Sequence, residues 1–223
     1  MQPDFDHGLL VFDSIMGGLA RMLRRLRYGA PIVVVSGLPR SGTSLMMQML
    51  QAGGLELVTD RVREPDASNP KGYFELEAVK ALDKRTPPDW LEGARGKAVK
   101  IVSSLVRWLP ERYDYRVIFM QRDLGEVMAS QNAMLAARGV PPDTSQDRAV
   151  EAHYRAHVAD TLRLLSRRRN CLTLVVDHRD ALTRPADTAR RVTRFLQLPL
   201  DLDRMAAVAD PTLYRNRRAA PPV

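Results

Sequence analysis

The chain has 223 residues, 45% of them hydrophobic and 27% charged, which allows a single domain with an ordinary hydrophobic core. Lys and Arg number 34 against 26 Asp and Glu, and the formal charge of +8 favours anionic partners such as nucleotides, nucleic acid or an anionic membrane surface. The single cysteine, Cys171, excludes an intrachain disulfide and a cysteine-based metal site. With one cysteine, a reducing, cytoplasmic setting is the default expectation. Because no apolar run reaches about 18 residues, we expect no membrane span.

Residues 1–28 are predicted to form an amphipathic helix, and residues 29–223 a single domain. Apolar side chains recur at three- and four-residue spacing from Leu9 to Leu26, and arginines gather at the C-terminal end of this stretch. Asp13 within the apolar segment is unlike a secretion signal. The helix could dock on its own domain, form a homodimer or make a peripheral membrane contact, and all three interpretations stay open.

From Pro31 onward, short apolar runs rich in Val and Ile alternate with stretches of helical periodicity. The runs predict buried strands at residues 32–36, 98–102, 116–120 and 172–177. Helical spacing predicts helices at residues 44–51, 76–82, 124–136, 147–166 and 186–196. This alternation indicates an α/β fold with a parallel sheet of about five strands, covered by helices on both faces.

A turn with two glycines, Gly37 and Gly42, joins the first predicted strand to the first predicted helix. In this context backbone N–H groups and a helix N-terminus can cradle a phosphate, and glycines allow the close approach that such a turn requires. The candidate phosphate ligands are Pro39, Arg40, Ser41, Gly42, Thr43 and Ser44. Thr43 stands where a nucleoside triphosphatase has its lysine, which disfavours ATP hydrolysis.

Residues 39–44, Pro-Arg-Ser-Gly-Thr-Ser, resemble the 5′-phosphosulfate loop of the sulfotransferases. The resemblance implies a P-loop nucleotide-binding fold and an enzyme that transfers a sulfuryl group from 3′-phosphoadenosine 5′-phosphosulfate (PAPS), leaving 3′-phosphoadenosine 5′-phosphate (PAP). It extends from about Pro31 to the end of the chain, since residues 174–182, Pro185 and residues 195–199 are similar to a largely structural segment of the same family.

A second strand-to-helix junction follows at Arg122. Asp123 and Glu126 have the spacing of a capping box, so the helix is expected to begin just after Arg122, with Ser130 on the same face as Asp123. Arg122 and Ser130 at this junction resemble the family's 3′-phosphate site. The basic tail, residues 214–218, contains Arg217, which could close over that phosphate or remain solvated.

Sulfuryl transfer, like phosphoryl transfer, passes through a loose in-line transition state, so cations near the transferred group are its main requirement. Arg40 is the first candidate and Lys100 the second. Residues 100–110 are similar to a family segment of the form Lys-x-His-Leu-Pro, with Lys100 at the lysine position and Val102 at the position of the histidine base.

Because Val102 cannot accept a proton, another base is needed, and other branches of the family use a glutamate. Glu75, which we favour slightly, and Glu64 are the contenders, and His178 is a weaker one. Nothing in the sequence resembles a set of metal ligands, and the resemblance implies no metal.

Two other interpretations remain open. A P-loop kinase or nucleotide-binding protein would need the missing lysine and an acidic Mg²⁺ ligand, for which Asp177 is the only candidate. A non-enzymatic module would bind an anionic surface, although 6% aromatic content argues against nucleic acid. The acceptor is expected to be a small molecule or a glycan, and the sequence does not distinguish a carbohydrate, a lipid or a small aromatic compound.

Overall fold

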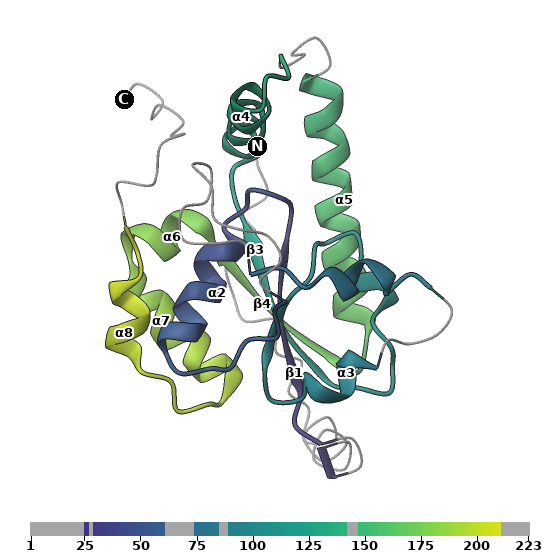
Figure 1. Cartoon of the computed structure of the whole chain (residues 1–223), viewed down its shortest axis with the longest axis vertical. Helices are drawn as coiled ribbons and strands as arrows, with labels where there is room; N and C mark the ends of the chain where they lie inside the picture. The colour runs from purple at the N-terminus through teal and green to yellow at the C-terminus, as the bar shows by residue number, and fades with distance from the viewer. Residues whose placement is uncertain (1–24, 27–28, 61–73, 85–88, 142–146, 211–223) are drawn as a thin grey trace.

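The computed structural model describes residues 25–26, 29–60, 74–84, 89–141 and 147–210. These residues fold around one parallel sheet in which the strand order is β2-β1-β3-β4 (Figure 1). The strands are β1 (Ile32–Gly37), β2 (Ala98–Lys100), β3 (Tyr115–Gln121) and β4 (Cys171–Asp177). The predicted α/β fold and the positions of its four predicted strands are confirmed.

The expected count of about five strands is corrected to four within the described residues. A single parallel bridge between Leu57 and Ala98 marks where a fifth strand would lie, outside β2. Beyond this bridge the strand pairing stops, because the next hydrogen-bond donors of the chain do not bond to β2. The Thr59 hydroxyl and the Asp60 amide both donate to the carbonyl of Glu75, which belongs to a loop and not to the sheet.

Alternate residues of the strands feed two separate apolar clusters, one on each face of the sheet. Val33 and Val35 of β1 point to one face, whereas Ile32 and Val34 point to the other. All six residues of β1 are buried, as expected for a central strand of a parallel sheet that is covered on both sides. Burial on both faces explains why these strands appear in the sequence as continuous apolar runs.

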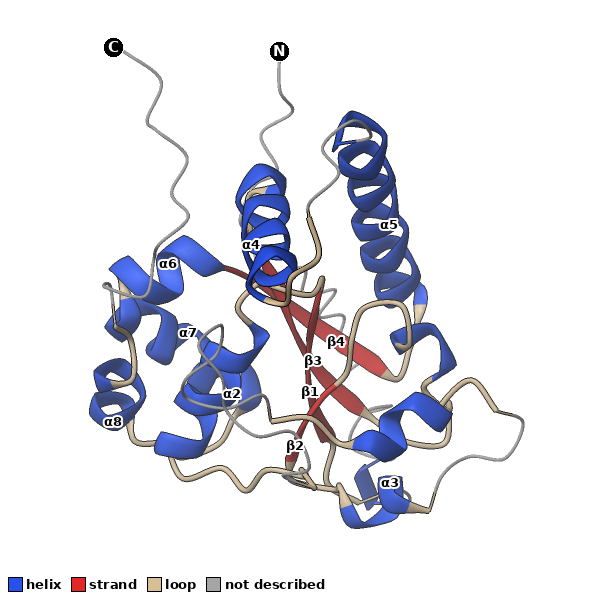
Figure 2. Ribbon diagram, turned by 45° about the horizontal axis from the view of Figure 1, so that its top comes forward, coloured by secondary structure: helices blue, strands red, loops and turns tan. Residues whose placement is uncertain are grey.

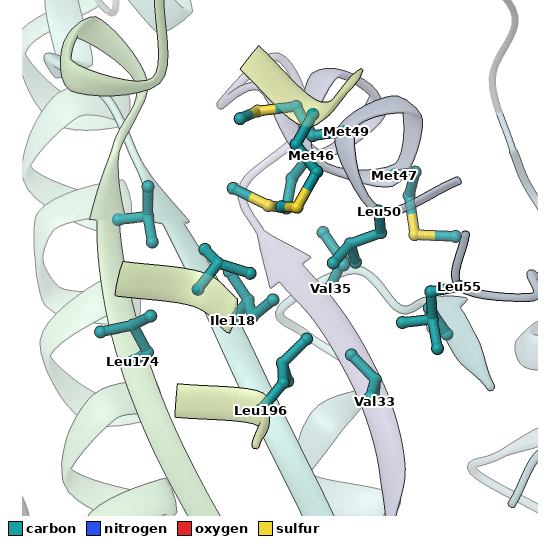
Figure 3. Packing of buried hydrophobic residues seen from close by; sticks show 14 of the residues in the cluster. Val33, Val35, Met46, Met47, Met49, Leu50, Leu55, Ile118, Leu174 and Leu196 are labelled. Carbon is teal, nitrogen blue, oxygen red and sulfur yellow. The ribbon is translucent and has the colours of Figure 1, made fainter. Parts of the chain in front are cut away.

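Helices cover both faces. Four of them pack over the face of Val33 and Val35, and Figure 3 shows the methionines and Leu50 of α2 against the strands. They are α2 (Thr43–Ala52), α6 (His178–Thr183), α7 (Pro185–Leu196) and α8 (Leu202–Ala207). The opposite face is covered by η1 (Glu77–Ala81), α3 (Trp90–Gly93), η2 (Val106–Trp108) and α5 (Asp147–Arg167).

Helix α4 (Leu124–Ala137) and the N-terminal part of α5 stand side by side beyond the carboxyl ends of the strands (Figure 2). Four of the five predicted helices are confirmed within two residues at each end. The fifth, residues 76–82, is a 3₁₀-helix, η1, and not an α-helix. The short elements α3, η2, α6 and α8 were not predicted, because three to six residues are too few to show a helical period.

The predicted N-terminal helix lies outside the described residues, except for residues 25 and 26, which are helical. Among the helices that the structure describes, no segment combines the length and the hydropathy needed to cross a bilayer.

Candidate functional site

The turn between β1 and α2 depends on residues with positive φ. Gly37 has φ +148°, Arg40 +69° and Gly42 +97°. A Cβ atom at Gly37 would collide with the Ser41 hydroxyl and the Met120 carbonyl, and one at Gly42 would collide with the ring of His178. The two glycines are therefore required both by backbone conformation and by space.

The N-terminus of α2 suits an anion. Gly42 is its N-cap and supplies no side-chain hydrogen bond, and the first turn contains no acidic residue. The first N–H groups of a helix have no acceptor within the helix, and the helix dipole places partial positive charge there. Arg40, which precedes the cap, adds a full charge at the same place. The chemistry of this turn fits a phosphate or sulfate group.

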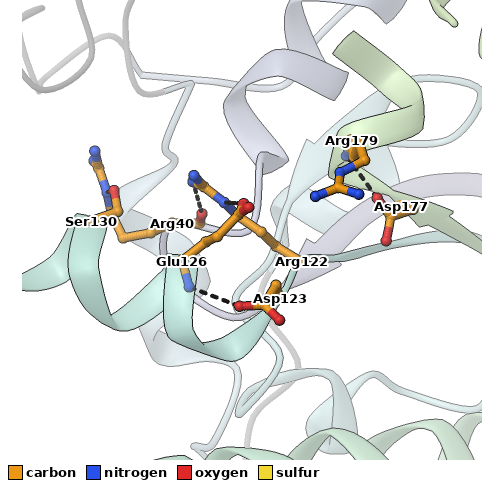
Figure 4. Close-up of polar contacts among 7 residues, drawn as sticks. All are labelled: Arg40, Arg122, Asp123, Glu126, Ser130, Asp177 and Arg179. Atoms are coloured by element: carbon orange, nitrogen blue, oxygen red, sulfur yellow. Dashed lines mark hydrogen bonds and ion pairs between the residues drawn. The ribbon is translucent and has the colours of Figure 1, made fainter. Parts of the chain in front are cut away.

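The junction after β3 is organised by a buried ion pair. Arg122 Nε donates to Glu126 Oε2 at 3.0 Å, and both side chains are buried. The Asp123 carboxylate accepts from the Glu126 amide at 3.1 Å and caps α4, which begins at Leu124 as predicted (Figure 4). The carboxylate of Glu126 turns to Arg122, because a buried guanidinium requires a counter-charge.

The two junctions are in direct contact. Arg40 Nε donates to Ser130 Oγ at 2.9 Å, and Arg122 Nη1 donates to the Arg40 carbonyl at 3.1 Å (Figure 4). Strands β1 and β3 are adjacent and pair Gly37 with Met120, so their carboxyl ends lie at the same edge of the sheet. The sequence predicted two separate phosphate sites, whereas the structure connects the residues of both in one basic cluster.

A second pair of predicted residues also meets. Lys100 ends β2, next to Val35 of β1, and its Nζ lies 3.3 Å from Glu75 Oε1. The Lys100 side chain is 10% exposed and that of Glu75 is 42% exposed. The Glu75 backbone is held by Thr59 and Asp60, whose bonds end the sheet pairing described above. One cation candidate and one base candidate therefore form an ion pair on the β2 side of the glycine turn.

Two solved structures of similar architecture are sulfotransferases. Mouse sulfotransferase SULT7A1 complexed with PAP matches with 16% identity and a TM-score of 0.46 over 81% of this chain. That match covers 62% of the mouse chain, so this chain spans less than two thirds of its length. A sulfotransferase from Alicyclobacillus acidocaldarius matches with 15% identity and a TM-score of 0.46, over 78% of this chain and 82% of that one. No protein-family model and no curated protein matches the chain.

His178 lies beneath the glycine turn and not in a loop, as first residue of α6. Burial, reinforced by the Arg122 cation and opposed by Glu126, lowers the pKa of His178 from its usual 6.5 to about 4. An imidazole with so low a pKa is a weak proton acceptor, and the ring instead forms the floor on which Gly42 packs.

Two predicted site residues, Glu64 and Arg217, lie outside the described residues. Val102, at the position of the family histidine, is exposed. Within the described ranges, no three His, Cys, Asp or Glu side chains gather as a metal ion would require.

The sequence identified two supporting residues, Glu126 and His178, but not the contacts that they make. Glu126 was assigned to a helix start, although its spacing of four from Arg122 was a signal for an ion pair at the start of α4. The contact of His178 with Gly42 joins residues 136 positions apart and leaves no local signal in the sequence.

Proposed function

We propose that this chain is a sulfotransferase that transfers a sulfuryl group from PAPS to a hydroxyl or amine of a small molecule or glycan. The observation that carries the proposal is the contact between Arg40 in the glycine turn and Ser130 on α4, with Arg122 bound to the Arg40 carbonyl. A nucleotide with phosphate groups at both its 3′ and 5′ positions needs two anion-binding positions in one connected site. The resemblance of residues 39–44, Arg122 and Ser130 to the family's two phosphate sites supports the same donor.

The cations of the site would stabilise the negative charge that develops in the transition state. In sulfuryl transfer the bond from sulfur to the PAP oxygen breaks as the bond to the acceptor oxygen or nitrogen forms, and negative charge grows on the leaving oxygen. In this proposal Arg40 and the N-terminus of α2 bind the 5′ group. Lys100, on the strand beside β1, supplies a second cation. Glu75 holds the Lys100 ammonium and is the candidate base on that side.

The kinase alternative is less well supported. The glycine turn has Thr43 where a triphosphatase has its lysine. The Asp177 carboxylate, its only candidate for an acidic Mg²⁺ ligand, accepts a hydrogen bond from the Arg179 amide at 2.7 Å and caps α6 (Figure 4). A carboxylate in this position stabilises a helix start, which is sufficient reason for its presence.

The test is a comparison of thermal stability with PAP, AMP and ADP. At a concentration 100 times its dissociation constant, a ligand stabilises the folded state by about 2.7 kcal/mol. We expect PAP to raise the melting temperature several degrees more than AMP or ADP do. Equal shifts with the three nucleotides would contradict the proposal, and a shift that requires Mg²⁺ and ATP would support the kinase.

Variants of Arg122 test whether this residue is responsible for the stronger stabilisation by PAP. Arg122→Ala should abolish the difference between PAP and AMP, but it leaves Glu126 buried without its partner and could prevent folding. The double variant Arg122→Gln, Glu126→Gln removes both charges together and should fold while losing the preference. Arg204→Ala, at an exposed position on α8, is the control and should keep the preference.

A further inference from the structure

Ser103 and His157 form a hydrogen-bonded pair that none of the contacts above includes. Ser103 Oγ lies 2.8 Å from Nε2 of His157, which is on α5. The serine is buried, with 3% of its surface exposed, and the histidine is half-buried. A serine hydroxyl bonded to an imidazole nitrogen is an arrangement that can transfer a proton.

The serine lies beside the glycine turn. After the last residue of β2 the chain continues along β1, since the Ile101 amide donates to the Val35 carbonyl at 2.9 Å. The Ser103 amide then donates to the carbonyl of Gly37 at 3.1 Å. Ser103 is therefore hydrogen-bonded to the first glycine of the turn, three residues after Lys100.

The histidine reaches the same edge of the sheet from α5. This helix ends at Arg167, just before β4 begins at Cys171, so its N-terminal part rises toward the carboxyl ends of the strands (Figure 2). His157 lies ten residues before Arg167, or about 15 Å along the helix axis. The seven residues of β4 span about 20 Å. The imidazole is thus near the level at which the strands end and the phosphate-binding groups begin.

The surroundings of His157 favour the neutral ring that accepts protons. Burial lowers the pKa of His157 below 6.5, and His153 and Arg107 lower it further, whereas Asp160 has a smaller opposite effect. The groups around the ring are Ser103 after β2, Arg107 on η2, and His153 and Asp160 on α5. At pH 7 the imidazole is uncharged and one ring nitrogen can accept a hydrogen bond from the Ser103 hydroxyl.

We propose that Ser103 and His157 form the proton relay that activates the acceptor, and this inference rests on the proposed sulfuryl transfer. The acceptor O–H or N–H gives its proton to Ser103 Oγ, and the Ser103 hydroxyl proton passes to His157 Nε2. The acceptor atom forms its bond to sulfur as the bond from sulfur to the PAP oxygen breaks, and the electron pair of that bond stays on PAP. The imidazolium then releases its proton to solvent.

This relay accounts for the absence of a histidine at position 102. Val102 follows Lys100 by two residues and cannot take a proton. His157 on α5 instead places an imidazole against Ser103, the residue after Val102. The Glu75 carboxylate is engaged with the Lys100 ammonium, so a proton acceptor bonded to Ser103 is the better placed of the two. The relay therefore replaces Glu75 as the base in our mechanism.

The first experiment measures hydrolysis of PAPS, with water as the acceptor, so that no natural acceptor is needed. His157→Gln can keep a hydrogen bond to Ser103 but cannot take the proton. We expect it to slow hydrolysis by roughly 100-fold, and Ser103→Ala to do the same, with PAP stabilisation unchanged. Ser104→Ala, at an exposed neighbouring position, is the matched control and should stay within about threefold of the wild type.

The pH dependence of PAPS hydrolysis distinguishes a proton relay from a hydrogen bond that only supports the structure. Hydrolysis by the wild type should fall on acidification through a pKa below 6.5, because only the neutral imidazole accepts a proton. His157→Gln should lack that step. A variant that keeps the wild-type rate and pH profile would overturn the relay, even if its melting temperature fell.

A titration of the His157 ring by NMR tests the placement without turnover. The midpoint should lie below 6.5 in the free protein and should rise when PAP is added, because nearby phosphates stabilise the imidazolium. An unchanged midpoint would place the ring away from the site and overturn the inference. If PAP stabilises the protein selectively but either result contradicts the relay, only the relay fails. If PAP shows no selectivity, the proposed function fails first.

Discussion

The two neighbouring strand ends of the site hold their functional groups by different means. After β1, the backbone does so, through positive φ angles at Gly37, Arg40 and Gly42 and through the packing of Gly42 on His178. After β3, side chains do so, through the buried pair of Arg122 and Glu126 and the Asp123 cap. The first junction is sensitive to any added Cβ atom, and the second is sensitive to any change of charge.

The sharpest way to break this contrast is Gly42→Ala. The methyl group must adopt φ near +97° and enters the space of the His178 ring, so we expect a loss of about 4 kcal/mol in the free energy of unfolding. Gly54 has a similar φ, +94°, and nothing within 4 Å of a Cβ atom. Gly54→Ala should therefore lose only about 1 kcal/mol, and chemical denaturation measures both.

The double variant Gly42→Ala, His178→Ala separates strain from collision, since it removes the ring that the methyl group would meet. It should be less destabilised than the sum of its single changes. Equal losses for Gly42→Ala and Gly54→Ala would show that only the backbone angle matters.

At the second junction, Glu126→Ala should cost about 3 kcal/mol, because it leaves the Arg122 guanidinium buried without its counter-charge. Glu126→Gln keeps an oxygen for the Arg122 N–H group and should cost less. Urea denaturation at neutral pH checks both. If the two variants were equally stable, the charge of Glu126 would not be what holds Arg122.

The smallest expected effect is in the pH dependence of stability. The pKa of His178 is about 4 in the folded protein and near 6.5 when unfolded, so between these values the unfolded state binds more protons. Stability from this group is complete above pH 6.5 and declines as the pH falls toward 4, with a loss of about 2 kcal/mol at pH 5. His178→Gln should lose less stability than the wild type between pH 7 and pH 5, and a parallel decline of both proteins would contradict this.

The features that the sequence predicts correctly are those encoded in a short run of consecutive residues. The glycine turn, the strands and the start of α4 were all predicted, because each is encoded in ten or fewer consecutive residues. The contacts of Arg40 with Ser130, Gly42 with His178 and Ser103 with His157 were not, since they depend on which strands are neighbours. The missing fifth strand was also a nonlocal result, as the hydrogen bonds of Thr59 and Asp60 to Glu75 end the pairing.

The hydrogen bond between Arg40 and Ser130 has a consequence for ligand selection through thermodynamic linkage. A ligand that draws the guanidinium away from Ser130 must also replace that bond, which is worth about 1.5 to 3 kcal/mol because one partner is charged. A monophosphate satisfies only Arg40 and leaves the buried serine hydroxyl to lose its donor. A bisphosphate can bond to both residues. The Arg40–Ser130 bond of the free protein should therefore favour a bisphosphate over a monophosphate by roughly tenfold or more in affinity.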